Sequence, residues 1–192
     1  APARWLQALA DGSQRYPDAG CFAGPLRLRI EGDPPRFCGR PEPIGTILDL
    51  GPRERPVDVV YGANMTMRSS AVTQVGPFDE ALSGPGDETE WQQRYRSRQG
   101  IVMYLPDAWV VHRRVFEGFS WRVELRARFR AGVKYARNSR RFGRKLKPGT
   151  ELLRACRGVG HALKERCAFG LMAAGTNLGR VWGWARPGNA HR

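Results

Sequence analysis

Apolar side chains that alternate with polar ones, or that form short runs, predict strands in the first 111 residues. Leu26, Leu28 and Ile30 alternate with Arg27 and Arg29, which predicts one buried and one solvent-facing side for a strand with a Gly-Pro interruption. This strand is predicted over 20–30, and others over 46–50, 57–61, 101–105 and 109–111.

Helical spacing predicts three helices among these strands. The first covers 1–11 and ends at Gly12, because Trp5, Leu6 and Leu9 then share one face. Strand and helix patterns follow each other along this part of the chain, and the fold class that we expect is α/β. The other two predicted helices run from a cap at Ser69 or Ser70 to Gly76, and from Glu88 to Gln99.

The last third of the chain has helical spacing and is strongly basic. Apolar residues recur every three or four positions in a helix predicted over 119–142, with arginines around them. Residues 121–147 contain eleven Lys and Arg but one acidic residue. A cationic amphipathic helix is typical of a membrane surface, although a helix packed on a folded domain shows the same pattern. We therefore predict two domains, 1–118 and a basic helical tail, 119–192.

A second helix in the tail is predicted over 168–184, which is apolar and rich in small residues. The pattern fits an interfacial or partly inserted helix, and it also fits a soluble helical hairpin. An uncharged run at 167–179 has 13 residues, short of the roughly 20 needed to cross a bilayer. Glycines at a spacing of four permit close contact between helices: Gly175, Gly179 and Gly183.

The net charge of +14 indicates an anionic partner. Nucleic acid is not favoured, because the sequence has no helix-turn-helix, zinc-finger or RNA-recognition pattern and its charge lies in a tail. Arginine outnumbers lysine 28 to 4, which indicates a GC-rich genome and hence a bacterium. Four cysteines without a Cys-x-x-Cys pair predict reduced thiols in a cytosolic protein.

Two segments carry candidate site residues. In the turn 62–64, Gly-Ala-Asn, small residues let backbone amides approach a ligand and the Asn offers an amide; an ordinary turn is the alternative. Asp87 and Glu90 have the spacing of a helix capping box, which does not require Glu88. Glu88 is therefore the better candidate for a functional carboxylate.

The order of these segments resembles the acceptor-side, C-terminal half of family 2 glycosyltransferases of the GT-A fold. In that family a Gly-Ala-Asn turn follows a strand, a helix precedes Gly-Phe-Asp, Glu-Asp opens the next helix, and a Pro-Asp strand ends in His. This chain departs at one point, since Asp87 precedes Glu88 where the family usually has Glu and then Asp. The matching segments are YGAN at 61–64, VGPFDE at 75–80, GDETEW at 86–91 and PDAWVVH at 106–112.

The resemblance implies an incomplete, Rossmann-like GT-A domain whose nucleotide-binding half lies upstream of Ala1. It implies inverting transfer of a sugar from a nucleotide-sugar donor to a hydroxyl of a glycan or lipid-linked acceptor. Glu88, or Asp87 in a shifted alignment, would be the catalytic base, and His112 would contact a divalent metal, Mn²⁺ or Mg²⁺. We expect Glu88 and His112 to face one cleft. The implied substrate-binding residues are Gly62, Ala63, Asn64, Asp79, Trp91 and Arg94.

The resemblance and the basic tail together predict where the protein works. We expect sugar transfer to an envelope polysaccharide, and we expect residues 119–192 to bind an anionic membrane surface. Both expectations together predict a cytoplasmic protein at the inner face of the plasma membrane. A basic protein that binds nucleic acid or a membrane surface without catalysis is the alternative.

Overall fold

The computed structural model describes residues 1–38, 47–80, 86–141, 143 and 145–186, and it confirms a mixed α/β chain. The chain forms two compact units. The first contains residues 1–29 and 45–114, and the second contains residues 30–44 and 115–192. This differs from the single division predicted at residue 118, because residues 30–44 belong with the C-terminal helices.

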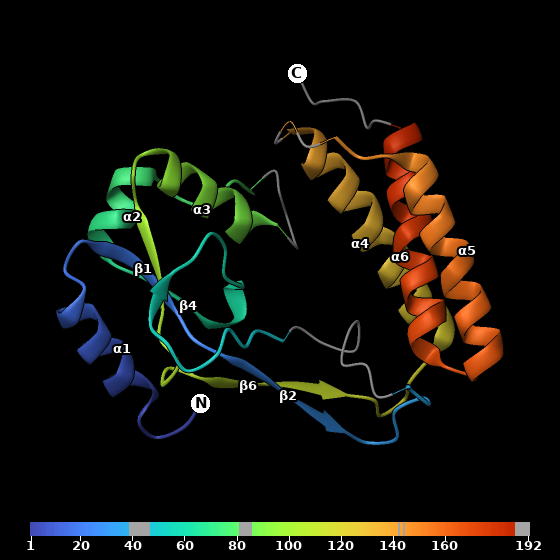
Figure 1. The fold of residues 1–192 in the computed structure, drawn as a ribbon, viewed down its shortest axis with the longest axis horizontal. Coiled ribbons are helices and arrows are strands. Elements are labelled where there is room, and N and C mark those ends of the chain that lie inside the picture. The colour runs from blue at the N-terminus through green and yellow to red at the C-terminus, as the bar shows by residue number, and fades with distance from the viewer. Residues whose placement is uncertain (39–46, 81–85, 142, 144, 187–192) are drawn as a thin grey trace. The chain divides into compact units, whose positions relative to one another are not determined.

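A mixed four-stranded sheet forms the centre of the first unit (Figure 1). The strands of the chain are β1 (Ala19–Ala23), β2 (Leu26–Glu31), β3 (Arg55–Pro56), β4 (Met65–Met67), β5 (Ile101–Tyr104) and β6 (Val110–Val115). The sheet order is β3-β5-β1-β4, in which β1 runs parallel to β5 and antiparallel to β4, and β3 runs antiparallel to β5. β2 and β6 form a separate two-stranded sheet.

Helices cover both faces of the four-stranded sheet. They are α1 (Trp5–Arg15), α2 (Ser69–Val75) and α3 (Asp87–Ser97), and the short 3-10 helix η1 (Gly62–Asn64) directly precedes β4. β1 is buried along its whole length and lies between α1 and the α2–α3 pair (Figure 1). Trp91 and Tyr95 of α3 pack with Cys21 and Val102 on one face. On the other face, α1 packs through Leu9 on a cluster of Ala19, Phe22, Met103, Leu105 and Ala108.

Two glycines let the helices approach the sheet closely. The Gly20 backbone N–H donates to the Tyr95 hydroxyl at 2.8 Å, and a Cβ at Gly20 would lie 2.8 Å from the Cβ of Ala71. Gly12 was predicted to end the first helix, and that prediction is wrong. It lies inside α1, where a Cβ would lie 2.9 Å from Cδ2 of Leu105. The glycine at this position therefore lets α1 pack closely on the Leu105 side chain, and it is not a stop signal.

The strand predicted over 57–61 is also wrong. The Val60 N–H donates to Oε1 of Gln92 at 2.7 Å, and the Val60 carbonyl accepts from Nε2 of Gln92 at 2.8 Å. The Gln92 side chain thus forms the hydrogen bonds with Val60 that the backbone of a neighbouring strand would otherwise form.

Three other strand predictions are changed by the structure. The strand predicted over 20–30 breaks at the Gly-Pro pair into β1 and β2, and Ile30 is 40% exposed. The strand predicted over 109–111 begins one residue later, as β6, and continues to Val115. In the stretch 46–50, position 46 lies outside the described residues and Leu48 forms an isolated bridge with Leu26.

Three helices form most of the second unit: α4 (Trp121–Arg141), α5 (Pro148–Glu165) and α6 (Ala168–Ala185). α6 packs against both α4 and α5. A Cβ at Gly183 would lie 2.7 Å from the Val133 carbonyl oxygen of α4, and a Cβ at Gly158 would lie 2.8 Å from the Gly170 carbonyl oxygen of α6. The small residues of α6 therefore permit close helix contact, as predicted. None of the helices in the described part of the chain has the length and apolar character of a membrane span.

We expect Gly179→Ala to destabilise the second unit. The new Cβ would lie 2.9 Å from the carbonyl carbon of Phe129, so α4 and α6 would have to move apart. The expected loss is about 1–3 kcal/mol in the free energy of unfolding, measured by urea denaturation followed by circular dichroism.

Gly160→Ala on α5 is the matched control, because among the described residues no atom lies within 4 Å of a Cβ built there. Alanine has the higher helix propensity, so this substitution should stabilise the protein by about 0.5–1 kcal/mol. Equal effects of the two substitutions would contradict the glycine-mediated packing of α6.

Candidate functional site

The turn at η1 and the start of α3 form a cleft of about 490 Å³. Four of the predicted site residues meet in it, two from each segment. Gly62 and Ala63 are exposed, whereas Asp87 and Glu88 are half-buried. The residues that line the cleft are Tyr61, Gly62, Ala63, Met65, Met67, Phe78, Asp87 and Glu88.

The Glu88 side chain lies directly against the glycine of the turn. A Cβ at Gly62 would lie 3.5 Å from both Cβ and Cγ of Glu88. The backbone N–H of Gly86 donates to Oε2 of Glu88 at 3.2 Å, and the Glu88 N–H donates to Oδ1 of Asp87 at 2.9 Å. Gly86 has φ = 113°, a left-handed value that glycine adopts most readily. Backbone donors and the helix N-terminus therefore hold two carboxyl groups side by side.

This environment changes the acidity of Glu88. Burial raises the pKa of Glu88, and the hydrogen bond and charge of Asp87 raise it further, whereas bonds with its own N–H and that of Gly86 lower it; the net direction is upward. A carboxylate with a raised pKa is a stronger base than an ordinary one. The cleft therefore offers a proton acceptor next to a space for a ligand.

Gln92, which the sequence analysis missed, holds the turn and α3 together. It is fully buried, and besides its two bonds to Val60 it donates to the Glu88 carbonyl oxygen at 2.9 Å. A signal was available in the sequence. Gln92 lies four residues after Glu88 and three before the buried Tyr95, so it shares a helix face with both.

Asn64, predicted to bind substrate, is 2% exposed and uses its amide within the protein. Its Nδ2 donates to the carbonyl oxygens of Ala108 at 2.7 Å and Pro25 at 3.3 Å, and its Oδ1 accepts from Nε1 of Trp5 at 3.0 Å. We therefore place the Asn64 side chain among the groups that position η1 and not among those that face the cleft.

Trp91 and Arg94 likewise support the site from inside the protein. Trp91 is fully buried and donates to the Gly76 carbonyl oxygen at 2.9 Å. Arg94 forms an ion pair with Glu90 at 2.7 Å and donates to the carbonyl oxygens of Val75 and Pro77. Both side chains hold the segment after α2 against α3. Asp79 lies in that segment, half-buried.

The capping box predicted at Asp87 and Glu90 is wrong. The residue that precedes the helix is Gly86, which as a glycine has no side chain to form a capping hydrogen bond. Glu90 is 7% exposed and pairs with Arg94 instead.

His112 does not line the cleft at Glu88. It lies within β6, half-buried, and the strand continues beyond it to Val115 instead of ending there. In the described part of the chain, it does not belong to a group of three or more metal-ligating side chains close enough to hold an ion. The cleft therefore contains the predicted base without the predicted metal ligand.

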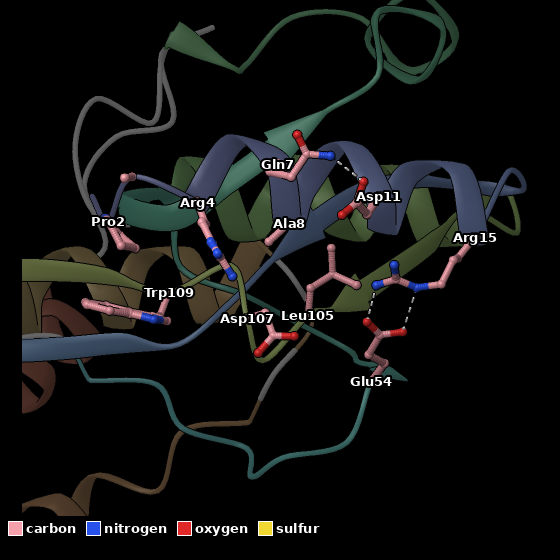
Figure 2. Close-up of a pocket in the computed structure, with 11 residues that line it drawn as sticks. Pro2, Arg4, Gln7, Ala8, Asp11, Arg15, Glu54, Leu105, Asp107 and Trp109 are labelled. Atoms are coloured by element: carbon pink, nitrogen blue, oxygen red, sulfur yellow. Dashed lines mark hydrogen bonds and ion pairs between the residues drawn. The ribbon is translucent and has the colours of Figure 1, made fainter.

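A larger cavity of about 660 Å³ lies between α1 and the turn that follows β5 (Figure 2). None of the predicted site residues lines it, and several of its charged groups are engaged with one another. Arg15 pairs with Glu54, and this hydrogen bond lowers the pKa of Glu54 against the opposing effect of burial. Gln7 donates to Oδ1 of Asp11 at 2.6 Å. We take the smaller cleft as the candidate site, because its carboxyl group is activated and not neutralised.

An α/β unit with an activated carboxyl group in a cleft is compatible with a group-transfer enzyme. The chain is 32% identical over 114 residues to the pre-mycofactocin glycosyltransferase of two Mycobacterium tuberculosis strains. The match covers 56% of this chain and 23% of the relative, so the chain spans about a quarter of the length of these curated relatives. No family model and no solved structure matches the chain. The similarity supports a relationship to glycosyltransferases over the matched part of the chain.

We expect Glu88→Gln to stabilise the protein increasingly as pH rises. The pKa of Glu88 in the folded protein lies above the ordinary 4.5, so folding disfavours its ionised form. The contribution of this carboxyl group to the free energy of unfolding is therefore complete at pH values below its ordinary pKa. It is lost as the pH rises through the raised pKa of the folded protein. The Gln variant has no such loss. Urea denaturation at a series of pH values measures the growing difference in the free energy of unfolding.

Gln93→Ala, also on α3, changes no ionisable group and should differ from wild type by a constant amount over the same pH range. A Glu88→Gln difference that shrinks as pH rises would contradict the raised pKa.

Proposed function

We propose that this chain is the acceptor-side part of a family 2 glycosyltransferase of the GT-A fold, which a nucleotide-binding half completes. The full protein transfers a sugar, with inversion, from a nucleotide-sugar donor to a hydroxyl of a glycan or lipid-linked acceptor. One observation carries the proposal: a half-buried carboxyl group of raised pKa, Glu88, lies against the exposed Gly62 in a cleft.

In this reaction Glu88 is the general base. Its carboxylate accepts the proton of the acceptor hydroxyl while that oxygen attacks the anomeric carbon of the donor. The bond from the anomeric carbon to the diphosphate oxygen breaks, and the nucleoside diphosphate leaves with its electron pair. A cleft of about 490 Å³ falls within the usual size of small-ligand sites. Asp87 is the alternative base, because the order of the two acidic residues is the reverse of the usual one.

The resemblance also implies a divalent metal, Mn²⁺ or Mg²⁺, which when bound stabilises charge on the departing diphosphate. His112 offers such an ion one imidazole nitrogen. The described residues around His112 do not supply the further ligands that a stable site needs. These residues therefore do not form the site by themselves, and we derive no step through it.

Glu88→Gln in the full-length protein should lower turnover about 10²–10⁴-fold, because the acceptor proton then has no base to receive it. Release of nucleoside diphosphate from a panel of UDP-, GDP- and dTDP-sugars measures the rate. Calorimetric titration with the same donors should show unchanged binding, since Glu88 acts on the acceptor.

Glu80→Gln removes an exposed acidic residue outside the cleft lining and should leave turnover unchanged. Near-normal turnover of Glu88→Gln would remove Glu88 from the role of base. A loss confined to Asp87→Asn would transfer that role to Asp87.

We further propose that the helical tail binds an anionic membrane surface, which places the protein at the cytoplasmic face of the plasma membrane. Residues 115–192 contain 18 Lys and Arg against 4 Asp and Glu, a net charge of +14, whereas residues 1–114 contain 14 of each. The excess charge of the chain therefore lies in its C-terminal part. Each basic residue close to an anionic leaflet contributes about 1 kcal/mol to binding.

α5 supplies the apolar part of this surface. Its exposed side chains recur at helical spacing along one side: Leu152, Cys156, Val159 and Leu163. Leu163 is 77% exposed. Arg157 and Lys164 lie exposed on the same helix. An exposed apolar stripe beside basic residues is the pattern of helices that bind in the plane of a membrane surface.

The double substitution Leu152→Asp and Leu163→Asp should abolish sedimentation with vesicles that contain phosphatidylglycerol. It removes the apolar stripe and introduces negative charge. Leu6→Asp is the matched control, because Leu6 is also a leucine exposed on a helix, 69%, but lies in the first unit. It should sediment as wild type does.

Wild-type protein should not sediment with vesicles of phosphatidylcholine alone. Undiminished sedimentation of the double variant would contradict the role of α5. A preference for duplex DNA over anionic vesicles would favour the alternative function, nucleic-acid binding without catalysis.

A further inference from the structure

Two cysteines and a histidine from separate segments meet in the second unit. Cys38 lies in the segment after β2, His161 lies on α5, and Cys167 directly precedes α6. Their ligand atoms all lie within 4.8 Å of one another, and Sγ of Cys38 lies 3.3 Å from Nε2 of His161. Cys38 is 123 positions from His161 and 129 from Cys167 in the sequence, so only folding brings the three together.

Neighbouring contacts fix the positions of these side chains. The backbone N–H of Cys38 donates to Sγ of Cys167 at 3.1 Å. The ring of Phe169 meets the imidazole of His161 edge to face, with 6.0 Å between the ring centroids. The Ala168 N–H donates to the Arg36 carbonyl oxygen at 2.8 Å, which ties the segment before Cys38 to the start of α6.

Neighbouring groups change the pKa of the Cys167 thiol. Burial raises the pKa of Cys167, but the side chains of Cys38 and His161 and the backbone N–H groups of Phe169 and Cys38 lower it, to about 7. The thiolate is the form of cysteine that binds metal ions.

We propose that Cys38, His161 and Cys167 bind a zinc-class metal ion. In a tetrahedral zinc site, with bonds of about 2.3 Å to sulfur and 2.0 Å to nitrogen, ligand atoms lie roughly 3.5–3.8 Å apart. The separation of 3.3 Å between Sγ of Cys38 and Nε2 of His161 is close to these values, and the other separations in the cluster are at most 4.8 Å. Cys38 is exposed, so water can complete the fourth position. Thiolate and imidazole ligands select Zn²⁺ or Co²⁺ over Mg²⁺ or Ca²⁺.

A disulfide between Cys38 and Cys167 is the competing explanation. A disulfide uses two sulfur atoms and has no need of an imidazole nitrogen 3.3 Å from one of them. A metal ion uses all three groups. Once bound, it would link the segment after β2 to the junction of α5 and α6, which is a structural role separate from catalysis.

Titration of the reduced, chelator-treated full chain with Co²⁺ tests the proposal. We expect a thiolate-to-cobalt charge-transfer band that saturates at one ion per chain and disappears when Zn²⁺ is added. Cys38→Ser and Cys167→Ser should each weaken Co²⁺ binding at least about tenfold, because each removes a ligand. His161→Gln should also weaken binding, but it should retain charge-transfer absorption from the two thiolates.

Cys156→Ser is the matched control, since Cys156 is an exposed cysteine on α5 outside the cluster, and it should bind Co²⁺ as wild type does. Circular dichroism of each variant checks its fold, and His161→Gln keeps the test valid if a Ser variant unfolds.

The proposal is overturned if reduced wild-type protein shows no charge-transfer band, or if the cluster variants bind Co²⁺ as well as wild type does. A Cys38–Cys167 disulfide that forms in air, in a chain that binds no metal when reduced, would establish the competing explanation. The assay detects the metal directly, so its outcome is independent of the turnover of Glu88→Gln.

Discussion

Two buried amide side chains hold the turn on which the candidate site depends. Gln92 takes both backbone groups of Val60 on one side of the turn, and Asn64 binds backbone carbonyl groups and an indole on the other. A buried polar group that loses its partner costs about 1–3 kcal/mol, so the turn cannot shift without breaking several costly contacts. Gly62 lies between the residues held by Gln92 and Asn64, so its position against Glu88 is fixed. The cleft is therefore preorganised for a ligand.

Elements with local signals could be predicted from the sequence. α2 and its end at Gly76, β5, α4 and α6 follow from apolar spacing and from residues that stop a helix. Gly12 and Val60 show where such reasoning fails. Gly12 resembles a stop signal, but it lies inside α1, where it packs closely on the Leu105 side chain. Val60 lies in an apolar run, but a buried glutamine distant in sequence satisfies its backbone.

Only part of the candidate site could be predicted, because contacts between residues distant in sequence determine which side chains face the cleft. Gly62 and Glu88 were both singled out from the sequence and do line one cleft, although the capping box that favoured Glu88 over Asp87 does not form. The side chains of Asn64 and Arg94 have the chemistry of ligand contacts, yet partners elsewhere in the fold occupy them. The cluster around Cys167 gave no signal, because its members lie too far apart in the sequence to form a motif.

The division of the chain has a consequence for how this protein can be dissected. Residues 30–44 leave the first unit, join the C-terminal helices and return, so the chain passes between the units three times. Dividing the chain at residue 118 would separate Arg36 and Cys38 from the C-terminal segments that they contact. A fragment or a graft that is meant to keep these contacts must therefore include residues 30–38 together with the C-terminal helices.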